Sequence, residues 1–203
     1  MKVRVPAITV ASVILLCAAG GAARADGFVE GVFGIASPLG DSDYDNGFDA
    51  SPKLSVRAGS WLREQDHVLM GVELGADLTF LDGPDNVPAT DLSYHRVRAI
   101  AGLRLAYDVN DKVRLTGRMA IGADYTRFHS STSAFGTTTE STQSNLGLAV
   151  DPSVELQVHL GGGSYGVEIG LPIGTHNGKG DDALVNYNSY DLDVLFVATA
   201  DFD

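Results

Sequence analysis

Apolar and polar residues alternate along most of this chain with a period of two. Between Val68 and Phe80 every even position is apolar, whereas the odd positions carry mostly small or charged residues. Side chains of a β-strand point to opposite faces in turn, so this alternation predicts a strand with one apolar face. The pattern returns in seven other segments, near residues 28–36, 54–62, 95–107, 113–125, 146–158, 165–173 and 190–202. We therefore expect an all-β chain with eight strands.

The connections between these segments alternate between long and short. The long ones cover about residues 37–51, 81–93, 128–142 and 175–188, and the short ones cover residues 63–67, 110–112 and 161–164. Short turns at one rim and long loops at the other are typical of an up-and-down barrel. Both termini then lie on the short-turn side.

Three observations indicate that the apolar face points outward into a membrane. A strand of about 13 residues, tilted by about 45°, spans roughly 30 Å, which matches the hydrocarbon core of a bilayer. Aromatic residues of the apolar face gather near the strand ends, for example Tyr125 and Tyr190 at one rim and Tyr107 and Tyr165 at the other. The opposite face combines small residues with charged ones in mid-strand, which suits a narrow lumen. The expected fold is an eight-stranded antiparallel up-and-down transmembrane β-barrel, and a soluble barrel with exchanged faces is the alternative.

The first 25 residues have the three parts of a secretory signal peptide. Lys2 and Arg4 precede an apolar run, and Ala23-Arg-Ala25 provides a cleavage site with small residues at the two required positions. We expect residues 1–25 to be removed and residues 26–203 to form the barrel.

Net charge and cysteine content exclude two classes of function. The chain has 14 basic and 26 acidic side chains, and removal of residues 1–25 takes away three basic ones, which leaves a formal charge of −15. A surface this acidic does not suit nucleic-acid phosphates, so we expect no nucleic-acid partner. Cys17 is the only cysteine and leaves with the signal peptide, which excludes disulfides and thiol chemistry.

The polar face predicts a lumen filled by paired charges, because an eight-stranded barrel is nearly filled by its interior side chains and buried ions need partners. The expected network comprises Glu30, Arg57, Glu73, Asp77, Arg96, Arg98, Arg104, Arg114, Arg118, Asp124, Asp151, Glu155 and Glu168. Counting from the turns gives these neighbours: Glu30 with Arg57, Asp77 with Arg96 and Arg98, Asp124 with Arg96, Asp151 with Arg118, and Glu155 with Arg114. A structural plug is the favoured interpretation, and a switchable network that passes small ions is the alternative.

The signal peptide, the eight amphipathic strands and the aromatic girdles resemble the small eight-stranded outer-membrane barrels typified by the OmpA transmembrane domain and the opacity and Ail-type proteins. The resemblance implies a bacterial outer-membrane location with both termini in the periplasm, and a structural or surface-interaction role. Its implied partners are outer-membrane lipid, lipopolysaccharide, and a host or cell-surface partner bound through the long loops. We expect a monomer without cofactor or enzymatic activity. Such proteins usually end on an aromatic residue, whereas here Asp203 follows Phe202.

An acidic loop offers a weak metal-binding candidate. Asp41, Asp43, Asp45 and Asp49 supply carboxylates at alternate positions, as in the start of a calcium loop. No Glu closes the loop at its twelfth position, where Pro52 stands. A solvated acidic loop without a metal site is the favoured interpretation.

A lipid A-modifying enzyme is the alternative function. The lipid A deacylases share this architecture and carry a His-x-Ser pair on a late strand, but here Gly178 stands two residues after His176. A second pair, His129 and Ser131, can approach Glu140 across a loop, on strands that do not match those of the deacylases. A periplasmic barrel that binds a small ligand is the third alternative, and we expect no catalytic residues.

Overall fold

A computed structural model describes residues 26–39, 49–82, 90–134, 137–160, 163–177 and 186–202. The expected signal peptide and the acidic residues Asp41, Asp43 and Asp45 lie outside this part of the chain. The strands are β1 (Gly27–Pro38), β2 (Ser51–Gln65), β3 (Val68–Asp82), β4 (Thr90–Asn110), β5 (Val113–Ala134), β6 (Thr137–Leu160), β7 (Gly163–Gly170), β8 (Ile173–Asn177) and β9 (Asn186–Phe202). No helix of the described residues is long and apolar enough to cross a membrane.

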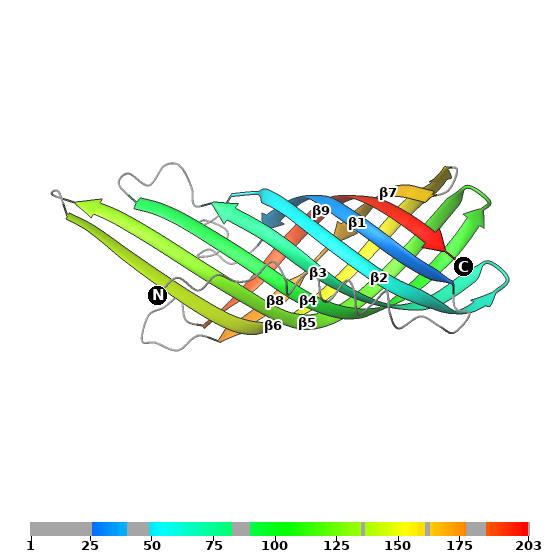
Figure 1. Cartoon of the computed structure of the whole chain (residues 1–203), viewed down its shortest axis with the longest axis horizontal. Helices are drawn as coiled ribbons and strands as arrows, with labels where there is room; N and C mark the ends of the chain where they lie inside the picture. Colours follow the sequence, from blue (N-terminus) through cyan, green and yellow to red (C-terminus); the bar gives the residue numbers. More distant parts are fainter. Residues whose placement is uncertain are drawn as a thin grey trace.

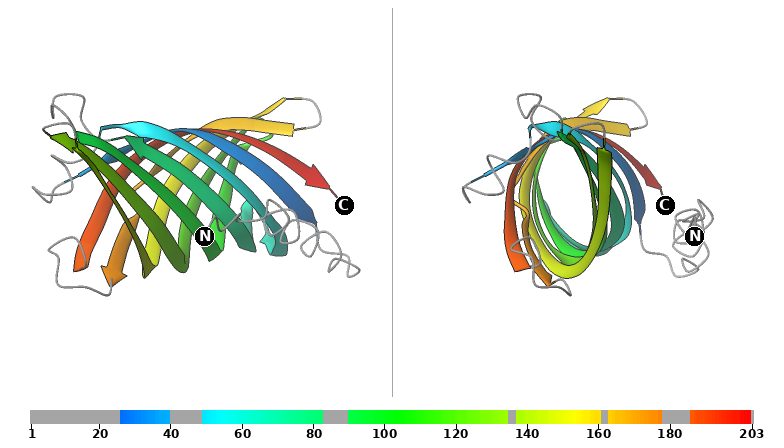
Figure 2. Two further views of the ribbon diagram at one scale, coloured as in Figure 1. Left: turned by 60° about the vertical axis from the view of Figure 1, so that its left-hand side comes forward. Right: turned by 90° about the vertical axis from the view of Figure 1, so that its left-hand side faces the viewer.

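The strands form a closed antiparallel ring (Figures 1 and 2). Gly27 at the start of β1 lies opposite Ser60 of β2 and opposite Phe202 of β9, so the first strand joins the last. The first and last strand residues therefore lie at one end of the ring, called here the turn end, and the opposite end is called the loop end. The expected all-β, antiparallel, up-and-down architecture is confirmed.

Two prolines interrupt the expected seventh strand, which the structure divides into β7 and β8. These two strands share one place in the ring, between β6 and β9, so the nine strands form an eight-stranded barrel. Gly170 of β7 faces Ser153, and Ile173 of β8 faces Val150, which is the same register on β6 without a shift. Pro152 and Pro172 fall in the gap between these pairs, and neither has an N–H to donate to the ladder. The interruption is local, and both halves pair with β9 as well.

The prediction of a long loop at about residues 128–142 is wrong. β5 and β6 continue as a paired ribbon to Ala134 and Thr137, with Ser131 opposite Glu140. Figure 1 shows this hairpin extending farther than the neighbouring strands at the loop end. Its many Ser and Thr residues suggested a loop, but Thr is β-branched and a ribbon satisfies backbone hydrogen bonds without an apolar face.

The two faces of the ring have inverted polarity, as expected for a transmembrane barrel. Large apolar side chains such as Leu103, Leu148 and Ile121 are more than 60% exposed on the outside. Charged side chains such as Arg57, Glu30 and Asp124 are at most 1% exposed on the inside. A water-soluble barrel would bury the first group and expose the second, so the outer surface suits a hydrocarbon solvent.

A small apolar cluster occupies the lumen near the turn end. Phe28, Trp61, Leu69 and Ala106 pack together, and the rings of Phe28 and Trp61 lie 5.1 Å apart. Phe28 lies directly opposite Gly59 across β1 and β2. A Cβ at Gly59 would overlap both the Phe28 ring and the Val72 carbonyl oxygen, so only glycine leaves room for this ring.

We expect Gly59→Ala to lower the free energy of unfolding by about 1–3 kcal/mol, because an added methyl overpacks the contact with Phe28. The matched control is Gly31→Ala, where a Cβ meets nothing within 4 Å. Urea unfolding in micelles, followed by fluorescence of the single tryptophan Trp61, measures both variants. Equal midpoints for the two variants would contradict the packing argument.

Candidate functional site: the charged lumen

The interior of the barrel contains nine buried carboxylates and seven buried cations among the described residues. All thirteen residues of the expected network are buried there, and Lys53, Asp191 and Asp193 join them. Because buried ions are stable only when they are paired and hydrogen-bonded, the positions of these groups decide whether the lumen is a plug.

The central cluster consists of three arginines and four glutamates: Arg57, Arg104, Arg118, Glu30, Glu73, Glu155 and Glu168. Arg57 donates to Glu30 at 2.9 Å and to Glu168 at 2.5 and 3.0 Å. Arg118 donates to Glu73 at 2.5 Å, to Glu168 at 3.0 Å and to the Ser153 hydroxyl at 2.7 Å.

Arg104 connects the remaining members of the central cluster. Its guanidinium lies 2.6 Å from Glu30, 2.7 Å from Glu73 and 3.3 Å from Glu155. It also lies 4.5 Å from the centre of the Phe28 ring, so the ion-pair cluster rests directly on the apolar cluster.

The loop-end cluster consists of Lys53, Arg96, Arg98 and five aspartates: Asp77, Asp124, Asp151, Asp191 and Asp193. The Lys53 ammonium lies 2.6 Å from Asp193 and 3.3 Å from Asp77. Arg98 contacts Asp124 at 2.9 Å and Asp191 at 3.4 Å. Arg96 pairs with Asp191 and lies 3.8 Å from Asp124.

A further group of polar side chains lies near the turn end, where its members contact one another. Arg114 donates to Asp108 at 2.7 Å, and its guanidinium lies 5.4 Å from the centre of the Trp61 ring. His159 Nδ1 lies 2.7 Å from the Ser164 hydroxyl, and His159 Nε2 lies 3.9 Å from Asp108. Ser164 is only 1% exposed, so this Ser–His–Asp arrangement joins strands and offers no accessible nucleophile.

The structure brings together Glu30 with Arg57 and Asp124 with Arg96, as the sequence suggested. Asp77 lies directly opposite Arg98 on the neighbouring strand, as expected, although its ion pair within 4.0 Å is with Lys53. Two other expected neighbours are corrected: Arg118 contacts glutamates in place of Asp151, and Glu155 contacts Arg104 in place of Arg114. The reason is that ring closure lets long side chains reach across the lumen, whereas counting from the turns considers adjacent strands alone.

Sequence reasoning missed Lys53, Asp191 and Asp193, although each alternates with apolar residues on its strand. Lys53 stands between Pro52 and Leu54, and Asp191 and Asp193 flank Leu192. Extending the period-two pattern by one residue before residue 54 would have placed Lys53 in the lumen, whereas Asp191 and Asp193 already lie at polar positions of the expected segment 190–202.

One group of carboxylates has the spacing of a metal site. Glu30, Glu155 and Glu168 each offer an oxygen within 4.8 Å of the others. Glu30 and Glu168 already accept hydrogen bonds from Arg57, and Glu155 lies 3.3 Å from Arg104. A divalent ion would have to compete with these guanidinium groups, so the arrangement is that of an ion-pair cluster.

The other candidate residues lie away from the lumen or outside the described part. Asp49, the one described member of the acidic loop, is exposed. Ser131 lies opposite Glu140 on the hairpin, but His129 Nδ1 lies 3.1 Å from the Thr142 hydroxyl. Gly178 is outside the described residues.

Comparison with known proteins identifies the fold. No protein-family model matches the chain, and no curated protein matches it. A major outer membrane protein of Thermus thermophilus is similar at 14% identity with a TM-score of 0.54, over 89% of this chain and 100% of that one. Ail of Yersinia pestis shows 15% identity and a TM-score of 0.48 over 89% and 100% of the two chains. OprG of Pseudomonas aeruginosa is similar at 16% identity with a TM-score of 0.48, over 88% of this chain and 96% of that one.

The chain has the fold of a small outer-membrane β-barrel, which confirms the resemblance inferred from its strands and girdles. At 14–16% identity these similarities show the fold alone. The charges in the lumen and the β5–β6 hairpin are therefore described from this chain only.

We expect Lys53→Met to lower the free energy of unfolding by about 3–5 kcal/mol, because it leaves Asp77 and Asp193 buried without a cation. Among the described residues, Lys53 is the only cation within 4.0 Å of either carboxylate. Urea unfolding in micelles measures the loss. Lys112→Met in the exposed β4–β5 turn is the matched control.

Combining Lys53→Met with Asp77→Asn and Asp193→Asn removes the unpaired charges, so part of the lost stability should return. An equally unstable triple variant would contradict the assignment of the loss to orphaned carboxylates.

Proposed function

We propose that the protein is an integral, monomeric outer-membrane barrel with a structural or surface-interaction role and no catalytic activity. The observation that carries this proposal is the combination of an apolar exterior with a lumen occupied by ion pairs and aromatic rings. Such a lumen favours neither a diffusion pore nor a ligand cavity, which leaves the outer wall and the loop end for interactions.

The β5–β6 hairpin is the surface that we propose for partner binding. Residues 130–142 contain nine Ser or Thr residues, and most of the described ones are exposed. Cross-strand contacts hold the ribbon together, including Ser133 Oγ to Thr138 Oγ1 at 3.0 Å. A two-stranded ribbon with hydroxyl groups on both faces can bind a polar partner through side chains and backbone.

We expect the hairpin to lie outside the cell and the short turns to lie in the periplasm. Because the only cysteine is Cys17, single cysteines can be introduced into a mature chain without background labelling. A membrane-impermeant maleimide should label a Ser133→Cys variant on intact cells. It should label an Asp111→Cys variant only after the outer membrane is permeabilised, and the reverse result would contradict the orientation.

Shortening the hairpin by replacing residues 130–141 with a two-residue turn tests the surface role. We expect lost adhesion of the cells to a host or neighbouring cell surface, while the barrel keeps its heat-dependent shift on a denaturing gel. The control is a strain that lacks the whole protein. Its adhesion and the sensitivity of its envelope to detergent are measured in the same way.

The outcomes separate the interaction role from the structural role. If removal of the chain sensitises the envelope but the shortened hairpin changes nothing, the role is structural. If removal changes neither adhesion nor sensitivity, the proposal is wrong. A change in the lipid A mass spectrum would then favour the alternative of a lipid A-modifying enzyme.

A further inference from the structure

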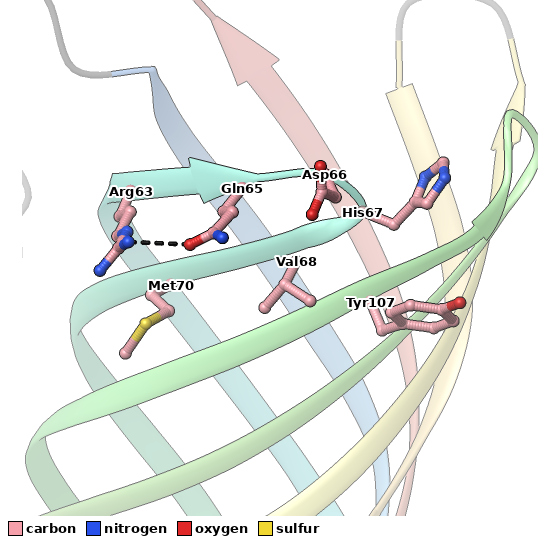
Figure 3. Close-up of a pocket in the computed structure, with 7 residues that line it drawn as sticks. All are labelled: Arg63, Gln65, Asp66, His67, Val68, Met70 and Tyr107. Carbon is pink, nitrogen blue, oxygen red and sulfur yellow. Dashed lines mark hydrogen bonds between the residues drawn. The ribbon is translucent and has the colours of Figure 1, made fainter.

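A pocket of about 420 Å³ opens on the outer surface of the barrel at the turn end (Figure 3). It is formed by the β2–β3 hairpin and the end of β4, and its lining comprises Arg63, Gln65, Asp66, His67, Val68, Met70 and Tyr107. The charged lumen described above contributes none of these residues. Val68 faces both Gln65 and Tyr107 in the sheet, so the pocket lies at the last paired residues of this end.

A β-bulge turns Arg63 toward the outside. The register of β2 and β3 shifts between Trp61, opposite Gly71, and Arg63, opposite Met70. Trp61 points into the lumen and is 8% exposed, whereas Met70 faces outward and is 50% exposed. The extra residue therefore moves Arg63 onto the outer face, which is the effect that a bulge has on the residues after it.

The polar side of the pocket carries two opposite charges that do not neutralise each other. Arg63 donates to the Gln65 side-chain oxygen at 2.8 Å, as Figure 3 shows. Among the described residues, no carboxylate lies within 4.0 Å of Arg63, and Asp66 makes no ion pair or side-chain hydrogen bond. Asp66 is held at the tip of the turn with a φ of 55°, a left-handed conformation that aspartate tolerates.

The other side of the pocket is apolar and continues into the outer wall. Val68, Met70 and the ring of Tyr107 form this side, and the Tyr107 ring packs edge-on against His67 at 6.3 Å. Leu105, the next outward residue of β4, is 54% exposed. A ligand that fills the pocket therefore needs a polar end with both charges and an apolar end that lies along the barrel.

We propose that this pocket binds a glycerophospholipid whose headgroup carries a phosphate and an ammonium, as in phosphatidylethanolamine. Arg63 donates hydrogen bonds to the phosphate, Asp66 accepts them from the ammonium, and an acyl chain lies along Val68 and Met70. Both charges then gain a partner at the depth where the Tyr107 ring meets the headgroups. This proposal rests on the membrane insertion and orientation proposed above, which place the turn end in the phospholipid leaflet.

Native mass spectrometry of the full chain tests the site. The barrel in detergent is incubated with equal amounts of phosphatidylethanolamine and phosphatidylglycerol of the same acyl length, and the lipid retained after detergent removal is counted. We expect one bound lipid per chain, with phosphatidylethanolamine preferred. Arg63→Gln should lower the retained lipid about tenfold, because it removes the charge-assisted contact to the phosphate.

Asp66→Asn tests the contact with the ammonium separately from the contact with the phosphate. We expect it to keep the retained lipid but to abolish the preference for phosphatidylethanolamine over phosphatidylglycerol. Arg127→Gln, which changes an exposed arginine near the loop end, is the matched control and should leave both readings unchanged.

Three results would overturn the proposal: no lipid retained by the unmodified chain, equal retention by the Arg63→Gln and Arg127→Gln variants, or displacement of the lipid by millimolar inorganic phosphate. The same preparations are inserted into vesicles of these lipids and scored for the heat-dependent gel shift. Insertion without lipid retention overturns this site alone, whereas failure to insert overturns the proposed function and this site together.

Discussion

The ion pairs inside the barrel are the interaction on which the rest of this structure depends. Among the described residues, seven cations and nine carboxylates lie buried within the ring, and all of them except Asp151 form an ion pair within 4.0 Å, which offsets the cost of burying charge. Each arginine of the central cluster contacts at least two carboxylates, so the strands are joined across the lumen as well as along their backbone ladders. The backbone hydrogen bonds close the ring, and the ion pairs fill it.

Apolar packing contributes a second layer that the charges alone would not provide. The rings of Phe28 and Trp61 lie below the central cluster, and Arg104 and Arg114 each lie over one of them. Gly59 leaves the space that the Phe28 ring needs. This layer adds apolar side chains to the interior near the turn end, so two different kinds of contact occupy the lumen.

The two interactions that we propose both use surfaces that these contacts hold in place. The β5–β6 hairpin extends from the loop end as a continuation of two long strands, so its position is set by the barrel and does not require a packed core of its own. The β-bulge in β2 acts at the opposite end, where one extra residue moves Arg63 from the lumen side to the outer wall. Both proposed interaction surfaces are thus local departures from a regular ring.

The sequence by itself determined the fold class, the antiparallel order and the inverted polarity, because period-two alternation and the spacing of turns are local properties. It also identified thirteen of the sixteen buried charges, since each lies on the polar face of its strand. Only the tertiary structure decided which charges pair, because Lys53 reaches Asp193, Arg104 reaches Glu30 and Arg118 reaches Glu168, all on strands that do not follow one another in the sequence. It also decided where the strands end, since the Ser- and Thr-rich hairpin has no apolar face and only backbone pairing with its partner reveals it as a ribbon. Local alternation specifies which face a side chain occupies, but partners across a closed ring depend on register and on the diameter of the barrel.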